Sequence, residues 1–460
     1  MSRRGTVAPM RVLVRVLTGL LVLVVVGAVA GYFYEKPLLR TATGYASHST
    51  CSVHFVAGRE DAEADLPPNP IRPYITGYVN QAGRSSAAAV LWVLAKQHAY
   101  FTPGFGCTVA EERPEGLGRA TDVDSDPNPL SDAPAPEMTD EVAEAISRAF
   151  GDDLSTERKE ALGTRAVVVL RDGDLVGERY GEGFDPTTPQ LGWSMSKSVA
   201  NLLLGRYAQE RDLDLDTDHL RPEWTDGRAE ITLDQLLRMT SGLEWDETYE
   251  LGTPITQMLF EEPDMAAYAA SQPLAHAPGT VQQYSSGDTN ILCQWITGLA
   301  DVPDTDFPRT QLFAPLGLSS AVWEPDASGI PVCSSYLWAT PRDWATIGQF
   351  ALQDGAWNDE QLLPEDWMTR STAATEVGQT DTEGFAASWY ANLEANGDLV
   401  DPELPDDAYW AVGHDGQQLF VVPSSDLVVV RLGFTPELDS AEWRTNRLVA
   451  DLVALGDQEE

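Results

Sequence analysis

The chain begins with a long apolar run. Residues 16–34 carry no charge between Arg15 and Glu35, and a helix needs about 20 apolar residues to cross a bilayer. Four arginines precede the run, and positive charge stays on the cytoplasmic side of a membrane. The pattern predicts a cytoplasmic basic tail over residues 1–15, a single-pass helix over 16–34 in the cytoplasmic membrane, and an extracytoplasmic body.

Two interpretations of this run compete. Ala28-Val29-Ala30 has the small residues of a signal-peptidase site. Tyr32, Phe33 and Tyr34 have the character of an interfacial aromatic belt, which is expected of a retained anchor. We favour the retained anchor, and both interpretations place the body outside the cytoplasm.

Apolar runs with strand character lie at both ends of the remaining chain. Residues 165–170 and 175–181 flank an Asp-Gly pair, which indicates a β-hairpin. Three further strand-like runs lie near the C-terminus, at 407–413, 417–423 and 427–433. Helices are predicted at 141–150 and 440–456, and helical and loop material fills the middle. This order predicts an α+β domain over residues 138–457, whose terminal strands share one antiparallel sheet.

Residues 41–112 form a separate N-terminal extension. Within it, the pattern predicts a short apolar helix over 86–100. Cys51 and Cys107 flank the extension, and export to an oxidising compartment predicts a disulfide between them. Segment 113–137 is rich in Pro, Asp and Ala, which is typical of a linker or a surface strap.

The bonding state of the other two cysteines, Cys293 and Cys333, remains open at this stage. Cys293 lies in an apolar segment of helical character, where a buried free thiol is also expected. No Cys and His spacing resembles a zinc site, so no metal and no cofactor are predicted. The acidic stretch 212–220 places aspartates at three EF-hand ligand positions, but His219 and Thr225 stand where Gly and Glu are required. A solvated acidic loop is the better interpretation.

Charge narrows the possible partners. The 460 residues include 30 basic and 71 acidic side chains, a net charge of −41, and only four lysines. Phosphates repel such a protein, so neither a nucleic-acid partner nor an anionic lipid surface is expected. The charge does not identify a substrate.

The first candidate for chemistry is Ser194-Met195-Ser196-Lys197, followed by an apolar run. On a helix, Ser194 and Lys197 lie three residues apart on one face. Burial lowers the pKa of a lysine, whose amine then accepts a proton from a neighbouring hydroxyl. Alone, this motif is also compatible with a capped helix and an exposed lysine.

Two further elements follow along the chain. Tyr284 precedes Ser285, Ser286 and a predicted helix that Asp288 would cap, and a tyrosine there can relay a proton. Residues 413–417, Gly-His-Asp-Gly-Gln, lie between two strand-like runs, where glycine lets a substrate approach the backbone. The N–H groups of Gln417 and Ser194 are predicted to form an oxyanion hole. The predicted substrate-binding and oxyanion residues are Ser286, His414, Gly416 and Gln417.

In this order, the three elements resemble those of class C serine β-lactamases and penicillin-binding relatives. They are more similar to the branch of 6-aminohexanoate-oligomer hydrolase and related esterases. Further similar stretches lie at 236–249 and 339–350. The resemblance covers roughly 138–457 and implies a β-lactamase/transpeptidase-like fold with a helical subdomain. It also implies an acyl-enzyme on Ser194, with Lys197 as its proton partner and Tyr284 as a second acid/base. Which of these two first takes the serine proton stays open.

Two departures from the β-lactamase pattern bear on the substrate. Tyr284-Ser285-Ser286 stands in place of Tyr-x-Asn, and His414-Asp415-Gly416 in place of Lys-Thr-Gly. The second change removes a permanent cation that would hold a substrate carboxylate. The resemblance then implies a small amide or ester rather than a β-lactam. The alternative is a slow penicillin-binding or sensor module, or a D,D-peptidase-like cell-wall protein.

Overall fold

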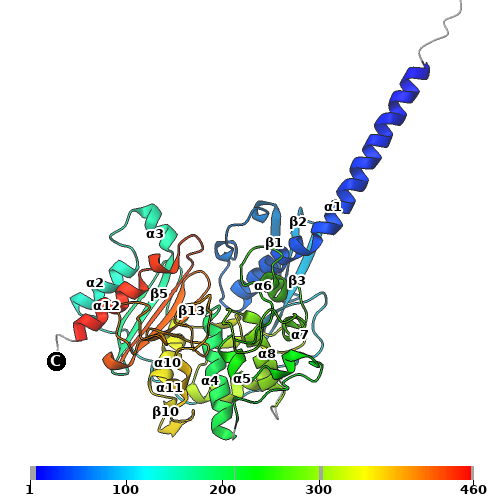
Figure 1. Cartoon of the computed structure of the whole chain (residues 1–460). Helices are drawn as coiled ribbons and strands as arrows, with labels where there is room; N and C mark the ends of the chain where they lie inside the picture. Colours follow the sequence, from blue (N-terminus) through cyan, green and yellow to red (C-terminus); the bar gives the residue numbers. More distant parts are fainter. Residues whose placement is uncertain (1–6, 212, 300–303, 457–460) are drawn as a thin grey trace, which may run out of the picture.

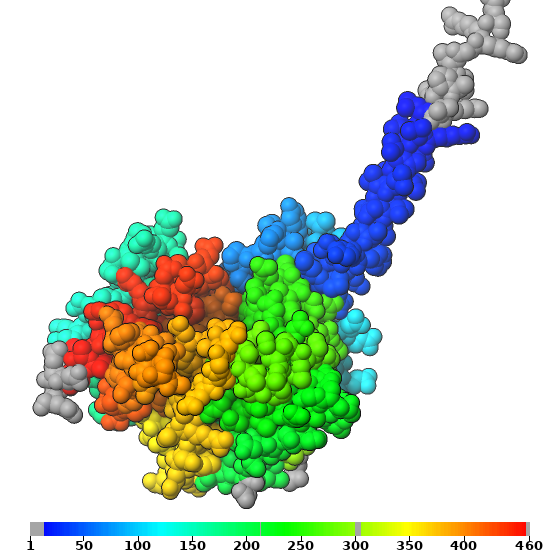
Figure 2. All heavy atoms as spheres, viewed as in Figure 1, coloured from blue at the N-terminus to red at the C-terminus, as the bar shows by residue number. Residues whose placement is uncertain are grey.

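The computed structural model describes residues 7–211, 213–299 and 304–456. Four parts of the predicted organisation lie outside the described residues: positions 1–6 of the basic tail, Asp212 of the acidic loop, and residues 300–303 and 457 of the predicted domain. Figures 1 and 2 show a rounded body with one long helix projecting from it.

The projecting helix is α1 (Val7–Phe55), with Pro37 inside it. Its side chains are exposed from Leu13 to Gly31 and buried from Thr41 to Ser49. Among the described residues, it is the one helix long and apolar enough to cross a membrane. The predicted span therefore continues into the body as the same helix, without an intervening loop.

A four-stranded antiparallel sheet packs along the buried half of α1. Its strands, in spatial order, are β1 (Ile75–Asn80), β2 (Ser85–Val90), β3 (Leu94–Thr102) and β4 (Gly106–Val109). The predicted helix over 86–100 is therefore wrong, because this stretch is the β2–β3 hairpin. Ser86 Oγ donates to the Ser47 carbonyl of α1 at 2.5 Å, and the three alanines after Ser86 are buried. This packing overrides the helix propensity of alanine.

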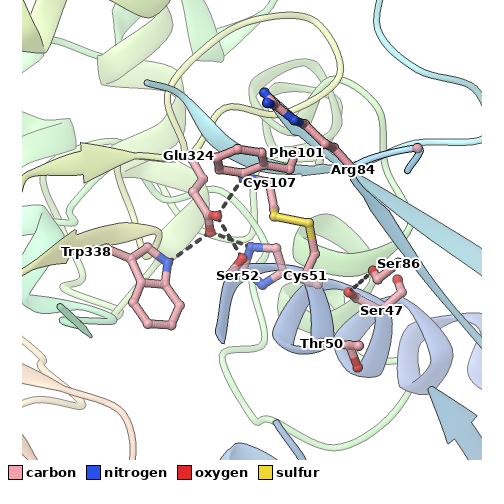
Figure 3. Close-up of a disulfide and its surroundings, with 12 residues drawn as sticks. Ser47, Thr50, Cys51, Ser52, Arg84, Ser86, Phe101, Cys107, Glu324 and Trp338 are labelled. Atoms are coloured by element: carbon pink, nitrogen blue, oxygen red, sulfur yellow. Dashed lines mark hydrogen bonds and ion pairs between the residues drawn. A yellow bond between two sulfur atoms is a disulfide. The ribbon is translucent and has the colours of Figure 1, made fainter. Parts of the chain in front are cut away.

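One buried cluster joins the end of α1 to the small sheet and to the body (Figure 3). The predicted disulfide between Cys51 and Cys107 is confirmed. Beside it, the carboxylate of Glu324 accepts bonds from Ser52 Oγ at 2.7 Å, Cys107 N–H at 2.7 Å and Trp338 Nε1 at 3.0 Å. Buried carboxylates require such partners, so this cluster holds the extension in one position on the body.

The central sheet of the body has six antiparallel strands. In spatial order they are β12 (Tyr390–Ala391), β13 (Tyr409–Gly413), β14 (Gln417–Val422), β15 (Leu427–Gly433), β5 (Thr164–Arg171) and β6 (Asp174–Tyr180). Val169 of β5 faces Val429 of β15. The chain-terminal strands of the domain thus share one sheet, and the predicted hairpin at Asp172-Gly173 is confirmed.

Helices cover both faces of this sheet (Figure 1). Successive side chains of a strand point to opposite faces. Val167 and Val169 therefore pack with α2 (Asp140–Ala149) and α12 (Thr445–Gly456). Val168 and Leu170 pack with α10 (Pro341–Leu352) and α4 (Met195–Glu210). The last helix begins at Thr445 rather than at the predicted residue 440, because a 3-10 turn occupies Ser440–Glu442.

The rest of the body is mostly helical. The remaining helices are α3 (Thr156–Leu162), α5 (Leu233–Leu237), α6 (Pro254–Phe260), α7 (Met265–Ala270), α8 (Ser286–Thr297), α9 (Ala314–Leu316) and α11 (Trp367–Thr372). Of these, α3 lies beside the central sheet. The short strands are β7 (Gln190–Leu191), β8 (Val322–Trp323), β9 (Leu337–Ala339), β10 (Ala356–Trp357) and β11 (Glu360–Gln361). Cys293 of α8 forms a disulfide with Cys333, so the pair that the sequence left open is bonded.

Segment 113–137 contains neither helix nor strand and lies against α10. Asn128 Nδ2 donates to Thr346 Oγ1 at 3.0 Å, and Ser131 Oγ donates to Asp343 Oδ1 at 2.9 Å. These contacts favour a surface strap over a free linker.

Candidate active site

The first element of the site lies where the chain enters α4. Ser194 is the residue before the helix, and Trp193 has a φ of 48°, in the left-handed region that bulky residues avoid. Tyr45 of α1 packs edge-on against the Trp193 ring at 5.8 Å. A Cβ on Gly192 would lie 2.1 Å from the Trp344 ring. Such backbone strain persists only where the surroundings hold it, and it is frequent at active sites.

Ser194 and Lys197 meet as predicted. Lys197 Nζ lies 2.8 Å from Ser194 Oγ, 2.9 Å from Ser286 Oγ and 2.9 Å from the Ser334 carbonyl oxygen. The lysine is 1% exposed. Burial lowers its pKa to about 8, and the negative charge of Glu247 opposes this shift. The three contacts match the three N–H donors of an ammonium group.

Tyr284 lies beside this pair, on the loop that leads into α8. Lys197 Nζ is 5.0 Å from the centroid of the Tyr284 ring. The Tyr284 backbone N–H donates to Asp381 Oδ1 at 3.0 Å, and its ring packs edge-on against Phe385. Burial raises the pKa of the Tyr284 phenol well above its usual value, so the phenol keeps its proton near neutral pH.

The cap of α8 differs from the prediction. Ser285 is the N-cap residue, and its side chain accepts from the Asp288 backbone N–H at 3.1 Å. Asp288 instead points into the core, where its carboxylate accepts from Ser241 Oγ at 2.8 Å. A serine one residue after Tyr284 reaches the helix N–H groups directly, which leaves the aspartate free to be buried.

This buried aspartate makes stability depend on pH. Burial raises the pKa of Asp288 to about 7, so the folded state binds a proton more tightly than the unfolded state does. Its contribution to stability is therefore greatest at low pH and is lost as the pH rises toward 7. We expect Asp288→Asn to raise the free energy of unfolding at pH 8 by at least ~1 kcal/mol. Urea denaturation at pH 8 and pH 4 checks this, because an equal effect at both values would contradict the assignment.

Ser286 connects the lysine to an acid that the sequence analysis missed. Its Oγ donates to Glu247 Oε1 at 2.5 Å, and its backbone N–H donates to Glu247 Oε2 at 2.9 Å. Trp245 Nε1 also donates to Oε2, at 2.6 Å. Lys197, Ser286 and Glu247 thus form a continuous hydrogen-bonded chain. The Trp-x-Glu spacing in the similar stretch 236–249 was a weak signal, because it did not show where the loop folds.

The third element closes the site from the end of the central sheet. A Cβ on Gly413, the last residue of β13, would lie 2.1 Å from the Gly192 carbonyl oxygen. The backbone contact between these glycines brings residues 413–417 next to the turn before Ser194. Gly416 has a φ of 97°, and a Cβ there would collide with the buried Arg431 guanidinium. This guanidinium donates to the Gly416 carbonyl, and the sequence analysis missed its role.

His414 is held between aromatic rings at the edge of the site. Its ring stacks on Tyr249 with 4.1 Å between the centroids, and it lies edge-on to Trp193 at 5.6 Å. Its Nε2 is 3.3 Å from the Asp415 carboxylate. Burial raises the pKa of Asp415, and the charge of His414 opposes this shift. Gln417 Nε2 donates to the Gly433 carbonyl at 2.7 Å, which fixes the start of β14.

The structure brings the predicted site residues together in two ways, through direct side-chain contacts and through contacts of the 413–417 loop. Ser194, Lys197 and Ser286 touch through side chains, and Tyr284 lies against the lysine. The loop 413–417 joins them through its backbone and through Trp193. Among the described residues, no three His, Cys, Asp or Glu side chains are grouped as metal ligands.

Three comparisons with known proteins agree with this architecture. The family model described as Beta-lactamase matches residues 152–452. The 6-aminohexanoate-dimer hydrolase of Paenarthrobacter ureafaciens is 23% identical over 316 residues, which are 62% of this chain and 76% of that protein.

Solved structures share the fold. A Bacillus anthracis protein provisionally described as a 6-aminohexanoate-dimer hydrolase has a TM-score of 0.58 at 20% identity, over 73% of this chain and 91% of that one. A novel penicillin-binding protein homolog from Caulobacter crescentus has a TM-score of 0.54 at 16% identity, over 70% of this chain and 99% of that one.

Proposed function

The chain belongs to the beta-lactamase family, and from this premise we propose that it is a membrane-anchored, extracytoplasmic serine hydrolase. It cleaves a small amide or ester through an acyl-enzyme on Ser194. The observation that carries this proposal is the 2.8 Å contact between Ser194 Oγ and Nζ of the buried Lys197. With a pKa of about 8, roughly a tenth of the lysine is neutral at pH 7.

In the acylation step, neutral Lys197 is the base. Its two remaining N–H groups stay on Ser286 Oγ and the Ser334 carbonyl, so its lone pair faces Ser194. The serine proton moves to this nitrogen while Oγ attacks the substrate carbonyl carbon. The backbone N–H groups of Ser194 and Gln417 stabilise the resulting oxyanion.

Tyr284 is the acid that completes acylation. Because burial raises its pKa, the phenol holds a proton that it donates to the leaving oxygen or nitrogen as the tetrahedral carbon collapses. The proton on Lys197 then restores the phenol. In deacylation, water replaces the leaving group and the same steps run in reverse, which releases the acid product.

The charges around Ser194 favour a substrate without a carboxylate next to the scissile bond. Glu247 lies behind Ser286, and Asp415 lies beside His414. The family pattern that binds a carboxylate has a lysine where this chain has His414. We therefore expect uncharged amides or esters to react faster than penicillins.

The course of α1 and the disulfides support the proposed location. Four arginines precede the apolar run, which orients the N-terminus toward the cytoplasm. Two disulfides stabilise the body, which fits an oxidising compartment. Tyr32, two residues after the candidate cleavage site, accepts a hydrogen bond from Ala95 N–H at 3.1 Å. This contact supports a retained anchor.

Intact-mass spectrometry of the full-length protein in detergent tests the reaction class. We would incubate it with an activated short-chain ester, a fluorophosphonate or a penicillin. The proposal expects fluorophosphonate modification at Ser194, ester turnover and no lasting penicillin adduct. A stable penicillin adduct would indicate the slow penicillin-binding alternative instead. Folded protein that no probe labels would contradict the proposed chemistry.

The role of Glu247 can be measured as a change in pH dependence. Glu247→Gln removes the charge that raises the Lys197 pKa, while its amide oxygen can still accept the N–H bonds of Ser286 and Trp245. The rising limb of kcat/KM for the ester, set by Lys197 deprotonation, should move to lower pH by about one unit. Glu244→Gln, an exposed acid on the same loop, is the matched control. An unmoved limb in Glu247→Gln would show that this acid does not control the lysine.

A further inference from the structure

The β2–β3 hairpin ends in an exposed apolar tip formed by Leu91, Trp92 and Val93. These side chains are 57%, 74% and 74% exposed. Outside α1, the other exposed large apolar side chains of the described residues are Tyr74, Tyr78, Met138, Leu299 and Leu393. Two of these, Tyr74 and Tyr78, belong to the same small sheet region, and the Tyr74 carbonyl accepts the Leu91 N–H. Contiguous exposed apolar surface commonly marks an interaction site.

The backbone at this tip is unfavourable for the residues that occupy it. Leu91 and Trp92 have φ values of 47° and 72°, and Val93 N–H closes the turn on the Val90 carbonyl at 3.2 Å. Two-residue turns with positive φ strongly favour Asn-Gly, because bulky side chains are strained there. Turn formation therefore does not account for Leu-Trp at these positions. An outlier of this kind points to a function at the tip.

The hairpin points along α1 toward the predicted membrane span. At its base, Ser86 bonds to Ser47 of α1. Nearer the tip, the Ala95 carbonyl accepts from Thr43, and the Ala95 N–H donates to Tyr32. The contacts move toward the N-terminus of α1 as the hairpin approaches its tip. Figure 1 shows β2 and β3 beside the part of α1 that enters the body.

The tip therefore lies at the level of the aromatic belt of α1. Tyr32 is followed by Phe33 and Tyr34, which are exposed like the tip. Aromatic rings of this kind concentrate at the membrane–water interface.

Charge supports the same placement. Lys36 follows the belt and Lys96 follows the tip, so two of the four lysines in this acidic chain lie at this level. Lys96 Nζ is 5.2 Å from the centroid of the Tyr78 ring. Lysines beside an apolar surface extend their ammonium groups toward lipid headgroups.

We propose that the tip Leu91-Trp92-Val93 inserts into the interfacial region of the bilayer that α1 crosses. The partner of this surface is lipid, and the tip is a second membrane contact beside the helix. This inference rests on the membrane span proposed above. With two membrane contacts, the body cannot rotate freely about the axis of α1, so Ser194 keeps one orientation relative to the bilayer.

Site-directed spin labelling of the full-length protein in lipid vesicles tests the proposal. The native cysteines are all in disulfides, so Trp92→Cys introduces one reactive thiol. Its nitroxide should be more accessible to oxygen than to a water-soluble nickel complex. Asn358→Cys is the matched control, because Asn358 is an exposed turn residue with positive φ in the β10–β11 hairpin, away from α1. Equal, water-like accessibility at positions 92 and 358 would overturn the proposal.

A spin label in α1 distinguishes failure of the proposed tip insertion from failure of the proposed membrane span. Leu23→Cys lies in the middle of the proposed span and should be buried in lipid. Lipid at position 23 with water at position 92 would refute the tip alone. Water at both positions would refute the span and the tip together.

A second variant tests the tip without relying on Trp92→Cys. The double substitution L91N/W92G gives the turn its favoured sequence while it removes the apolar side chains. A nitroxide at Val93→Cys should move from lipid to water in this background. The rate of fluorophosphonate labelling at Ser194 should stay the same, which shows that the body is folded. A Val93→Cys label that keeps its depth would overturn the proposal.

Discussion

Ser194→Ala should reduce hydrolysis of an activated ester by about four orders of magnitude or more, while the melting temperature stays nearly unchanged. The catalytic loss follows because Ser194 Oγ is the proposed nucleophile, while the other hydroxyl that Lys197 contacts, Ser286 Oγ at 2.9 Å, donates to Glu247. The stability is spared because the Ser194 side chain makes no capping hydrogen bond to α4. Its hydroxyl thus has little structural role. Initial rates and thermal denaturation of the same preparation measure both effects.

Ser196, the second serine of the motif, provides a control in which stability is expected to fall while the reaction at Ser194 persists. Ser196 is fully buried, and its Oγ accepts the Leu337 N–H at 3.2 Å. Ser196→Ala leaves that N–H unpaired and should cost about 1–3 kcal/mol of stability. Fluorophosphonate labelling at Ser194 should persist. If Ser194→Ala retained the wild-type rate, or if Ser196→Ala lost all labelling while folded, the nucleophile would be wrongly assigned.

Lys197→Met should lower kcat/KM by about 10³- to 10⁴-fold. Methionine has a similar length and fills the buried space, but it can neither accept the serine proton nor donate to Ser286 and the Ser334 carbonyl. The residual rate should lose the pH dependence near pH 8 that Lys197 sets. Steady-state rates between pH 6 and pH 10 provide the measurement.

Two comparisons show whether this loss is specific. Lys159 lies on the surface, where it pairs with Asp152 at 2.6 Å, and Lys159→Met should leave the rate unchanged. Ser194 and Lys197 act on the same proton, so Ser194→Ala/Lys197→Met should be no slower than Ser194→Ala alone. Additive losses in the double variant would mean that the lysine acts elsewhere.

The sequence predicted the parts of the fold that depend on local pattern. The strands at 165–170 and 427–433 are apolar on both faces, which is expected when helices cover both sides of a sheet. The proximity of Ser194 and Lys197 could be predicted because a spacing of three residues places both side chains on one face of a helix. Cys51 and Cys107 were paired from the expected compartment.

The parts that were missed depend on contacts between distant segments. Glu247 becomes part of the site only because its loop folds back onto Ser286. The hairpin at 86–100 was mistaken for a helix because alanine favours helices, and its packing on α1 was not visible in the sequence. Tyr45 reaches Trp193 only because α1 continues past the apolar run into the body.

The uninterrupted course of α1 also limits where the proposed reaction can take place. Tyr34 ends the apolar run, and Tyr45, 11 positions later, packs against Trp193, the residue before Ser194. At about 1.5 Å per residue, this separation is at most roughly 17 Å along the helix axis. Without a flexible tether, the serine cannot sweep a larger volume. If α1 spans the membrane as proposed, hydrolysis at Ser194 is confined to a thin layer above the lipid, and a substrate must diffuse into that layer, or already reside there, to be cleaved.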